Sequence, residues 1–432
     1  MKEGQVSRRE FMRGAAAAGA AFGAFTILGT TAKGQGKALK VALIGCGGRG
    51  TGALQQHVDA AKILNDQLNL GVEVKVVATC DYFAGKAKDA GKKHGVPEDR
   101  CFGGPNGYKK VCEGDADIVL LGETPAFRPP HFAAAVKAGK HVFMEKPVAV
   151  DAPGCRLVIE AGEEAKKKGL LVVAGTQRRH EEGYNRQAAL IKEGARGKVL
   201  AGRVGWCGGG WNEKPVGELS PDRLVSSWYF WVQMSGDHIV EQHVHNLDVA
   251  NWFVGSHPIA CMAFGGRARR RAGNIFDFFS GDVEYPGGVH IHSMCRQVNK
   301  CWEWVSEDFV YEKQPPPGFK LSDPLPYSEI PQKTPDGKWF GGHQQEHVNM
   351  LYYLAKGKEL NEARSVAEST AVAVMIRDSA YTGERIEWKA MMEDPKLKPE
   401  LYNLKLRPSW EDYEQGTVEL PKEGDFPIPG KA

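Results

Sequence analysis

Short, uninterrupted apolar runs recur in the first half of the chain, with helical stretches between them. The runs cover residues 41–44, 74–80, 117–121, 141–144 and 170–174. Continuous apolar runs of about four to eight residues are typical of strands buried on both faces of a parallel sheet. Because such strands alternate here with helices, the pattern predicts an α/β domain built on a doubly wound parallel sheet, which we assign to residues 38–175.

The length of the chain points to a second domain. Its 432 residues exceed what one compact core usually holds, so we expect a separate unit over residues 176–386. After about Glu387 the chain becomes rich in proline and charge, which predicts an extended tail over residues 387–432.

A glycine-rich turn, Gly45-Cys46-Gly47-Gly48-Arg49-Gly50, directly follows the first predicted strand and opens a helix expected to reach about Leu64. In this setting the backbone N–H groups at the helix N-terminus face a pyrophosphate, and side chains in place of the glycines would block its approach. A tight turn without a ligand is the alternative. The strand before the turn and the helix after it favour a dinucleotide, bound by Gly45, Gly47, Gly48, Arg49 and Gly50.

Asp81 ends the second predicted strand, where a carboxylate can accept hydrogen bonds from a ribose diol. It lies further along the chain than is usual, which a long connection over residues 65–71 explains. A carboxylate at this place repels a 2′-phosphate, so NAD is expected rather than NADP. Lys86 and Lys88 nearby keep that preference moderate.

A second motif follows the later strands: Thr124-Pro125, then His131, then Glu145-Lys146-Pro147. Together with the glycine turn, it resembles the Gfo/Idh/MocA family of oxidoreductases. The resemblance implies a Rossmann domain joined to an α+β domain with a large open, mostly antiparallel sheet. It also implies that Thr124, Pro125, His131 and Glu145 lie at the cofactor and that Lys146 reaches both nicotinamide and substrate. Without the resemblance, a surface lysine at a strand end would be the simpler interpretation of Lys146.

The segment 237–248 carries the second group of candidate catalytic residues. If it is helical, Glu241, His245 and Asp248 share one face, with His238 one turn earlier. The resemblance implies that His245 is the base that takes the alcohol proton, that Glu241 supports it in place of the usual aspartate, and that Asp248 lies at the substrate. Two other interpretations stay open: a metal site of His238, Glu241 and His245, or histidines that only pack the helix.

Further candidates line the expected substrate pocket. The family resemblance places Gln177, Arg178 and Tyr184 there, although structural hydrogen bonds at a domain junction would suit the first two equally well. Trp206, Trp211 and the aromatic run 228–231 could stack on a sugar ring or pack in the core.

The residues His343, Glu346 and His347 match the H-x-x-E-H pattern of some zinc peptidases. Such a short pattern recurs by chance, and a zinc peptidase would leave the Rossmann half unexplained. We therefore expect no metal.

Composition narrows the class of protein. An apolar fraction of 42% and a charged fraction of 25% are those of an ordinary globular protein, and a net charge of +3 does not indicate nucleic-acid binding. The nine cysteines form no C-x-x-C pair. We therefore expect them to be small hydrophobic residues buried in the core.

The first 32 residues have the pattern of a twin-arginine signal peptide. Arg8 and Arg9 precede an Ala/Gly-rich run over residues 14–28 and small residues up to Ala32. The run is shorter than the ~20 apolar residues that span a bilayer, which disfavours a membrane anchor. The twin-arginine machinery is thus an expected partner and the periplasm the expected location, with the signal either cleaved or kept as a tether.

The family resemblance, together with these observations, implies NAD-dependent hydride transfer at a secondary hydroxyl of a sugar, glycoside or polyol, in an enzyme expected to form a homo-oligomer. Because soluble NAD is not supplied outside the cytoplasm, the cofactor is expected to be tightly bound. Three alternatives stay open: an NAD-dependent glycosidase that works through a transient ketosugar and β-elimination, a metal-dependent hydrolase, and a sugar-sensing protein without turnover.

Overall fold

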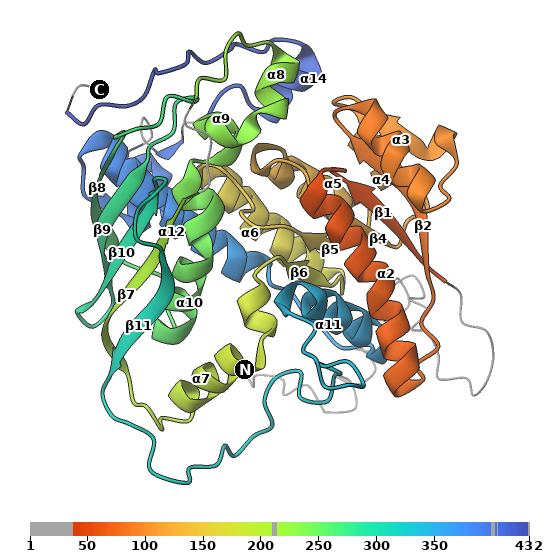
Figure 1. Ribbon diagram of the computed structural model, residues 1–432, viewed down its shortest axis with the longest axis horizontal. Helices are drawn as coiled ribbons and strands as arrows, with labels where there is room; N and C mark the ends of the chain where they lie inside the picture. The colour runs from red at the N-terminus through yellow and green to blue at the C-terminus, as the bar shows by residue number, and fades with distance from the viewer. Residues whose placement is uncertain (1–37, 210–213, 399–401, 404, 431–432) are drawn as a thin grey trace, which may run out of the picture.

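The computed structural model describes residues 38–209, 214–398, 402–403 and 405–430. The expected signal peptide and Trp211 lie outside these residues. The described chain is built around two six-stranded sheets, one on each side of the molecule in Figure 1. None of its described helices is long and apolar enough to cross a membrane.

The first sheet is entirely parallel and has the strand order β3-β2-β1-β4-β5-β6. This order confirms the doubly wound fold that the apolar runs predict. Its strands are β1 (Leu39–Ile44), β2 (Val74–Asp81), β3 (Cys101–Gly103), β4 (Ile118–Leu121), β5 (His141–Met144) and β6 (Val172–Ala174).

The predicted runs correspond to β1, β2, β4, β5 and β6, whereas β3 was not predicted. This strand has only three residues, and one face of it is only partly buried, so it leaves no apolar run to recognise. The connecting helices are α2 (Gly48–Leu68), α3 (Ala84–Lys93), α4 (Gly107–Glu113), α5 (Arg128–Lys137) and α6 (Ala152–Lys167).

The second sheet is open and mixed, in the order β11-β7-β10-β9-β8-β12. Only the β7–β10 pair is parallel, so the expected mostly antiparallel sheet is confirmed. The strands are β7 (Val199–Gly208), β8 (Ala260–Gly266), β9 (Phe278–Tyr285), β10 (Val289–Gln297), β11 (Trp304–Tyr311) and β12 (Ile386–Glu387). Helices α10 (Val244–Val254) and α12 (Ala363–Thr382) cover one face of this sheet (Figure 1).

Late segments of the chain return to the first domain. Helix α11 (Gly342–Lys356) packs against α2, and α12 packs against α6. Between β6 and α10 the chain forms the short helices η4 (Gln177–His180), α7 (Glu182–Lys192), α8 (Pro221–Ser226), η5 (Trp228–Phe230) and α9 (Val232–Ser235). The segment after Glu387, for which an extended path is expected, contains short helical turns and the helix α14 (Trp410–Gln415).

Candidate active site

The glycine turn between β1 and α2 is shaped by two very close backbone approaches. Gly45 has φ +92°, and a Cβ there would lie 2.1 Å from the backbone nitrogen of Glu123. A Cβ on Gly50 would lie 1.8 Å from the carbonyl oxygen of Gly45. At Gly47 and Gly48, by contrast, a Cβ would meet no protein atom. Protein packing therefore requires the two outer glycines, while the two inner ones leave open space in front of the N-terminus of α2, as a pyrophosphate would need.

A cavity opens beside this turn, at the carboxyl ends of β1, β2 and β4. Five of the predicted cofactor residues line it: Gly45, Gly47, Asp81, Thr124 and His131. Parallel sheets of this topology bind dinucleotides at this edge.

Buried polar atoms in the cavity lack partners within the protein. His131 Nδ1 and Glu123 Oε1 face each other at 3.3 Å, whereas His131 Nε2 and Glu123 Oε2 have no partner within the protein, and both side chains are at least nine-tenths buried. Such atoms normally find a partner, so a polar ligand is expected here. The residues present thus fit the ribose and pyrophosphate groups of a dinucleotide.

Asp81 is fixed by the backbone on both sides of the cavity. Its carboxylate accepts hydrogen bonds from the backbone N–H of Cys46 (2.7 Å) and of Phe83 (2.9 Å). Burial raises the pKa of the carboxyl, and these two hydrogen bonds oppose the rise. Each oxygen keeps a second lone pair, which is what a ribose diol requires.

Other predicted cofactor residues lie beside the cavity rather than on its wall. Pro125 begins the turn η3 (Pro125–Phe127) and is buried. Arg49 donates from Nε to Glu145 Oε1 (2.6 Å), and Glu145 is 3% exposed. This ion pair connects the glycine turn to the end of β5, one residue before Lys146.

Lys146 is held by a single residue of the second domain. Its Nζ donates to Glu241 Oε2 (2.8 Å) and to the carbonyl oxygen of Glu241 (2.6 Å). Burial raises the pKa of the Glu241 carboxyl, and the charge of Lys146 opposes that rise. The pair therefore fixes an ammonium group where the two domains meet.

Glu241 does not share a regular α-helical face with His245, contrary to the prediction. Residues Ile239–His243 form a π-helical turn, and the α-helical geometry of α10 begins only at Val244. The wider turn changes the angle between successive side chains, so the spacing rule for an α-helix does not apply. Glu241 is directed to Lys146, while the ring of His245 stacks on Trp206 with centroids 5.7 Å apart.

Burial lowers the pKa of His245 well below 6.5, and the nearby charges of Lys146 and Arg178 lower it further. A histidine in this state is neutral at ordinary pH and can accept a proton.

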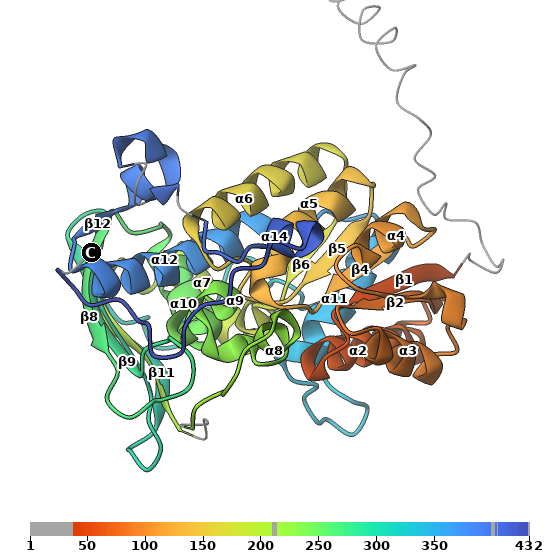
Figure 2. The same cartoon turned by 90° about the horizontal axis from the view of Figure 1, so that it is seen from above.

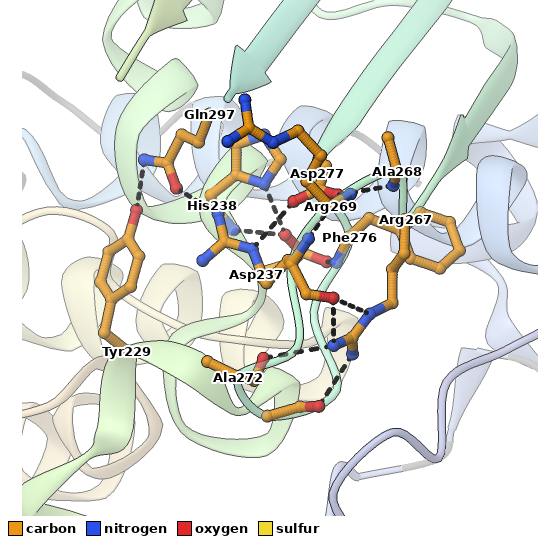
Figure 3. Close-up of polar contacts among 12 residues, drawn as sticks. Tyr229, Asp237, His238, Arg267, Ala268, Arg269, Ala272, Phe276, Asp277 and Gln297 are labelled. Carbon is orange, nitrogen blue, oxygen red and sulfur yellow. Dashed lines mark hydrogen bonds and ion pairs between the residues drawn. The ribbon is translucent and has the colours of Figure 1, made fainter. Parts of the chain in front are cut away.

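The other two histidines of this segment have structural partners. His238 Nδ1 contacts Asp237 Oδ1 (2.8 Å), and His243 Nε2 contacts Ser293 Oγ (2.9 Å). Figure 3 shows Asp237 between His238 and the backbone N–H of Phe276, to which it is bonded at 2.8 Å. The proposed metal ligands His238, Glu241 and His245 are thus directed to different partners, and the described part of the chain contains no cluster of three or more metal-ligating side chains.

The predicted substrate residues are joined through a carboxylate that the sequence did not reveal. Glu307, on β11, accepts hydrogen bonds from Arg178, from the hydroxyl of Tyr184 (3.1 Å) and from Asn246 (2.5 Å). Gln177 lies in η4 with its amide oxygen buried and without a hydrogen bond. The geometry therefore links η4, α7 and α10 to one strand of the open sheet.

Asp248, expected at the substrate, is 1% exposed and already paired. Its carboxylate accepts two hydrogen bonds from Arg179 Nε and Nη2 (2.8 and 2.9 Å) and one from Ser369 (2.8 Å). These contacts join η4, α10 and α12. Asp248 therefore lies at the junction of these three elements.

Of the H-x-x-E-H residues of α11, His343 and Glu346 stay close, with Nδ1 and Oε1 3.7 Å apart, whereas His347 has a partner on another helix. His347 faces His57 of α2, with the two Nδ1 atoms 3.3 Å apart. Glu346 is fully buried, and burial raises its pKa well above 4.5. His343 lies at the start of the helix, where the charges of Arg49 and Lys146 add to burial in lowering its pKa. The motif could not predict the contact between His347 and His57, because these residues lie far apart in the sequence.

A parallel dinucleotide-type sheet, joined to an open mixed sheet with a lysine and a neutral histidine at the junction, defines the class of two-domain, NAD-binding oxidoreductases. Comparison with known protein families supports this class. The family "Oxidoreductase family, NAD-binding Rossmann fold" matches residues 39–175, and the "GFO/IDH/MocA C-terminal domain" matches residues 184–306. The chain belongs to the Gfo/Idh/MocA family.

Curated relatives are similar over part of their length. Inositol 2-dehydrogenase of Salmonella typhimurium is 29% identical over 217 residues, which make up 50% of this chain and 54% of that protein. The enzyme of the same name from Burkholderia ambifaria is 28% identical over 257 residues, 59% of this chain and 66% of that protein. The chain thus spans about half the length of the Salmonella relative.

Solved structures share the fold at low identity. Levoglucosan dehydrogenase in complex with NADH and levoglucosan has a TM-score of 0.62 at 16% identity, covering 81% of this chain and 99% of the other. Scyllo-inositol dehydrogenase from Lactobacillus casei, with bound NAD(H) and scyllo-inositol, has a TM-score of 0.57 at 15% identity over the same shares.

Proposed function

We propose that this protein catalyses NAD-dependent hydride transfer at a secondary hydroxyl group of a sugar, glycoside or polyol. The observation that carries the proposal is the placement of Lys146. It follows the end of β5, is linked to the glycine turn through Glu145 and Arg49, and is held by Glu241 beside the helix that carries His245. Bound NAD supplies the hydride acceptor.

The side chains have complementary roles in this reaction. His245, kept neutral by burial, takes the proton of the substrate hydroxyl while the hydride leaves the adjacent carbon. Lys146 donates a hydrogen bond to the same oxygen and stabilises the negative charge that develops there. Glu241 orients Lys146 through two contacts, one from its side chain and one from its backbone. We therefore assign Glu241 to support Lys146, whereas the sequence suggests that it supports His245.

The substrate class is supported by the names of the relatives. Inositol dehydrogenases and levoglucosan dehydrogenase act on polyols and on a sugar derivative, and two of the similar structures contain such a compound together with NAD(H). Asp81 at the ribose position of the cavity favours NAD over NADP.

We further propose that the enzyme is exported through the twin-arginine machinery to the periplasm and carries its cofactor as a resident group. The paired residues Arg8 and Arg9 and the apolar run after them support this location. Cell fractionation of the full chain, compared with an Arg8→Lys, Arg9→Lys double variant, tests it. Export of the double variant at the wild-type level would contradict the proposal.

The catalytic assignment is tested by Lys146→Met and His245→Asn, each assayed with NAD and a panel of polyols and glycosides. We expect each change to lower turnover by about 10²–10⁴-fold while NAD still binds. Unchanged turnover in either variant would refute the assignment. Analysis of products for a ketosugar or a released aglycone distinguishes net oxidation from a redox-neutral glycosidase reaction.

A further inference from the structure

The segment 405–416, which contains α14 and is called the strap below, lies over the cavity that holds the predicted cofactor residues. Trp410 of the strap lines this cavity together with Gly45, Asp81 and His131. Val225 of α8 and Trp228 of η5 line it as well. Figure 1 shows α14 beside α8 at the top of the molecule, and the hydroxyl of Tyr413 donates to the carbonyl oxygen of Pro221 (3.3 Å).

The strap is packed onto the cavity wall by aromatic rings. Trp410 is 4% exposed, and its ring centroid lies 4.4 Å from those of both Phe127 and His131. Tyr413 is 5% exposed and packs edge-to-face on Tyr82, with centroids 5.6 Å apart. Tyr82 and Phe127 follow β2 and β4, which flank β1 at the edge of the sheet where dinucleotides bind in this fold.

The strap also shields the partnerless polar atoms of the cavity. The ring of His131 stacks on Tyr108 and meets Trp410 edge-on, and its Nε2 has no hydrogen-bond partner, nor does Oε2 of the neighbouring Glu123. With the strap in place these atoms cannot reach bulk water. A buried, aromatic-walled space with free acceptors and donors suits a nucleoside.

Besides its buried aromatic contacts, the strap has polar attachments, some of them partly exposed. Glu414 accepts hydrogen bonds from Tyr108 (3.2 Å) and Lys109 (2.9 Å), and the backbone N–H of Leu406 donates to Asp151 (3.0 Å). Exposed ion pairs of this kind stabilise weakly. The cavity that Trp410 lines measures about 100 Å³, below the ~300–1,000 Å³ of most ligand sites, so the strap narrows the space beside the glycine turn.

We propose that Trp410 is a cofactor-contacting residue, and that the strap closes over the adenosine half of NAD and slows its release. The inference rests on the proposed NAD-dependent function and adds to it a physical means of keeping the cofactor bound. Base stacking on an aromatic side chain weakens strongly on truncation to alanine, so Trp410→Ala should raise the Kd for NAD by roughly ten- to a hundredfold.

The experiment compares the full-length wild type, Trp410→Ala and the control Trp302→Ala, whose side chain is 74% exposed beside the second sheet. Calorimetry gives the Kd for NAD, and release of nucleotide after gel filtration and denaturation gives the amount retained per protein. We expect the wild type and the control to retain nucleotide and Trp410→Ala to lose it.

Equal Kd and equal retention in Trp410→Ala and the wild type would overturn the inference while leaving the proposed function intact. A wild type that binds no NAD would instead refute the proposed function. If Trp410→Ala fails to fold, Glu414→Gln tests the proposal instead, because this change weakens an attachment of the strap that lies outside the cavity. Its NAD dissociation rate should rise several-fold, and an unchanged rate would overturn the proposal.

Discussion

Lys146 and His245, the two residues of the proposed proton transfer, have different environments. The lysine donates hydrogen bonds to two oxygen atoms of Glu241, whereas burial and nearby positive charge lower the pKa of the histidine. A hydrogen-bond donor and a neutral acceptor at the same site are what the proposed removal of a hydroxyl proton requires.

Because the charge of Lys146 contributes to the low pKa of His245, Lys146→Met should raise that pKa toward 6.5. In the wild type His245 stays neutral as the pH falls below 6.5. The decrease of kcat/KM at acidic pH should therefore begin below pH 6.5. NMR titration of the His245 ring in both proteins measures the shift. A lower pKa in the variant would contradict the electrostatic account.

Asp81 offers a prediction about cofactor choice. Asp81→Ser removes the negative charge that repels a 2′-phosphate and leaves Lys86 on the same cavity wall. The ratio of kcat/KM for NAD over NADP should fall by about tenfold or more, which corresponds to about 1.4 kcal/mol. Steady-state kinetics with both nucleotides measures it, and an unchanged ratio would mean that Asp81 does not face the ribose.

At the scale of elements, the site depends on how closely α11 approaches η4. A Cβ on Gly342, the first residue of α11, would lie 2.8 Å from the Cβ and the carbonyl oxygen of Gln177. This approach brings the start of α11, with His343, to the segment that carries Arg178.

Gly342→Ala should therefore destabilise the protein by about 1–3 kcal/mol, because the backbone of η4 cannot move aside easily. Gly183→Ala in α7 is the matched control: its Cβ would meet no atom within 4 Å, and alanine favours a helix. Urea unfolding of both variants provides the measurement. Equal stability of the two would show that the close approach is not required.

The sequence predicted the elements whose signal is local. Most buried strands of the first sheet and the glycine turn follow from runs of a few residues, and Lys146 from the short Glu145-Lys146-Pro147 motif of the family that the chain resembles. The link from Arg178 and Tyr184 to Glu307 joins residues more than 100 positions apart, and no local pattern records it. The π-helical turn at Glu241 was missed for a different reason, since it breaks the period on which the helical prediction relies.

At the scale of the whole molecule, buried neutral histidines couple stability to pH. Burial lowers the pKa of His57, which faces His347 between α2 and α11, to about 3. In the unfolded chain the same ring titrates near 6.5. Below pH 6.5 the unfolded state therefore binds a proton that the folded state does not, and stability falls with a slope of about 1.4 kcal/mol per pH unit from this group.

His57→Asn keeps a hydrogen-bonding group opposite His347 but cannot titrate. The free energy of unfolding of this variant should fall less steeply between pH 6.5 and 4.5 than that of the wild type. Denaturant unfolding at several pH values measures both slopes. Identical slopes would contradict a neutral, buried His57.

The central claim, hydride transfer from a secondary carbinol to NAD at Lys146 and His245, is tested most directly by a single turnover. The NAD-loaded enzyme is mixed with polyols and glycosides that carry deuterium on the carbinol carbon. The account predicts that reduced nicotinamide forms and contains the deuterium, and that Lys146→Met and His245→Asn lose this step while still binding NAD. Product formation without any label in the nicotinamide, or at the wild-type rate in both variants, would contradict it.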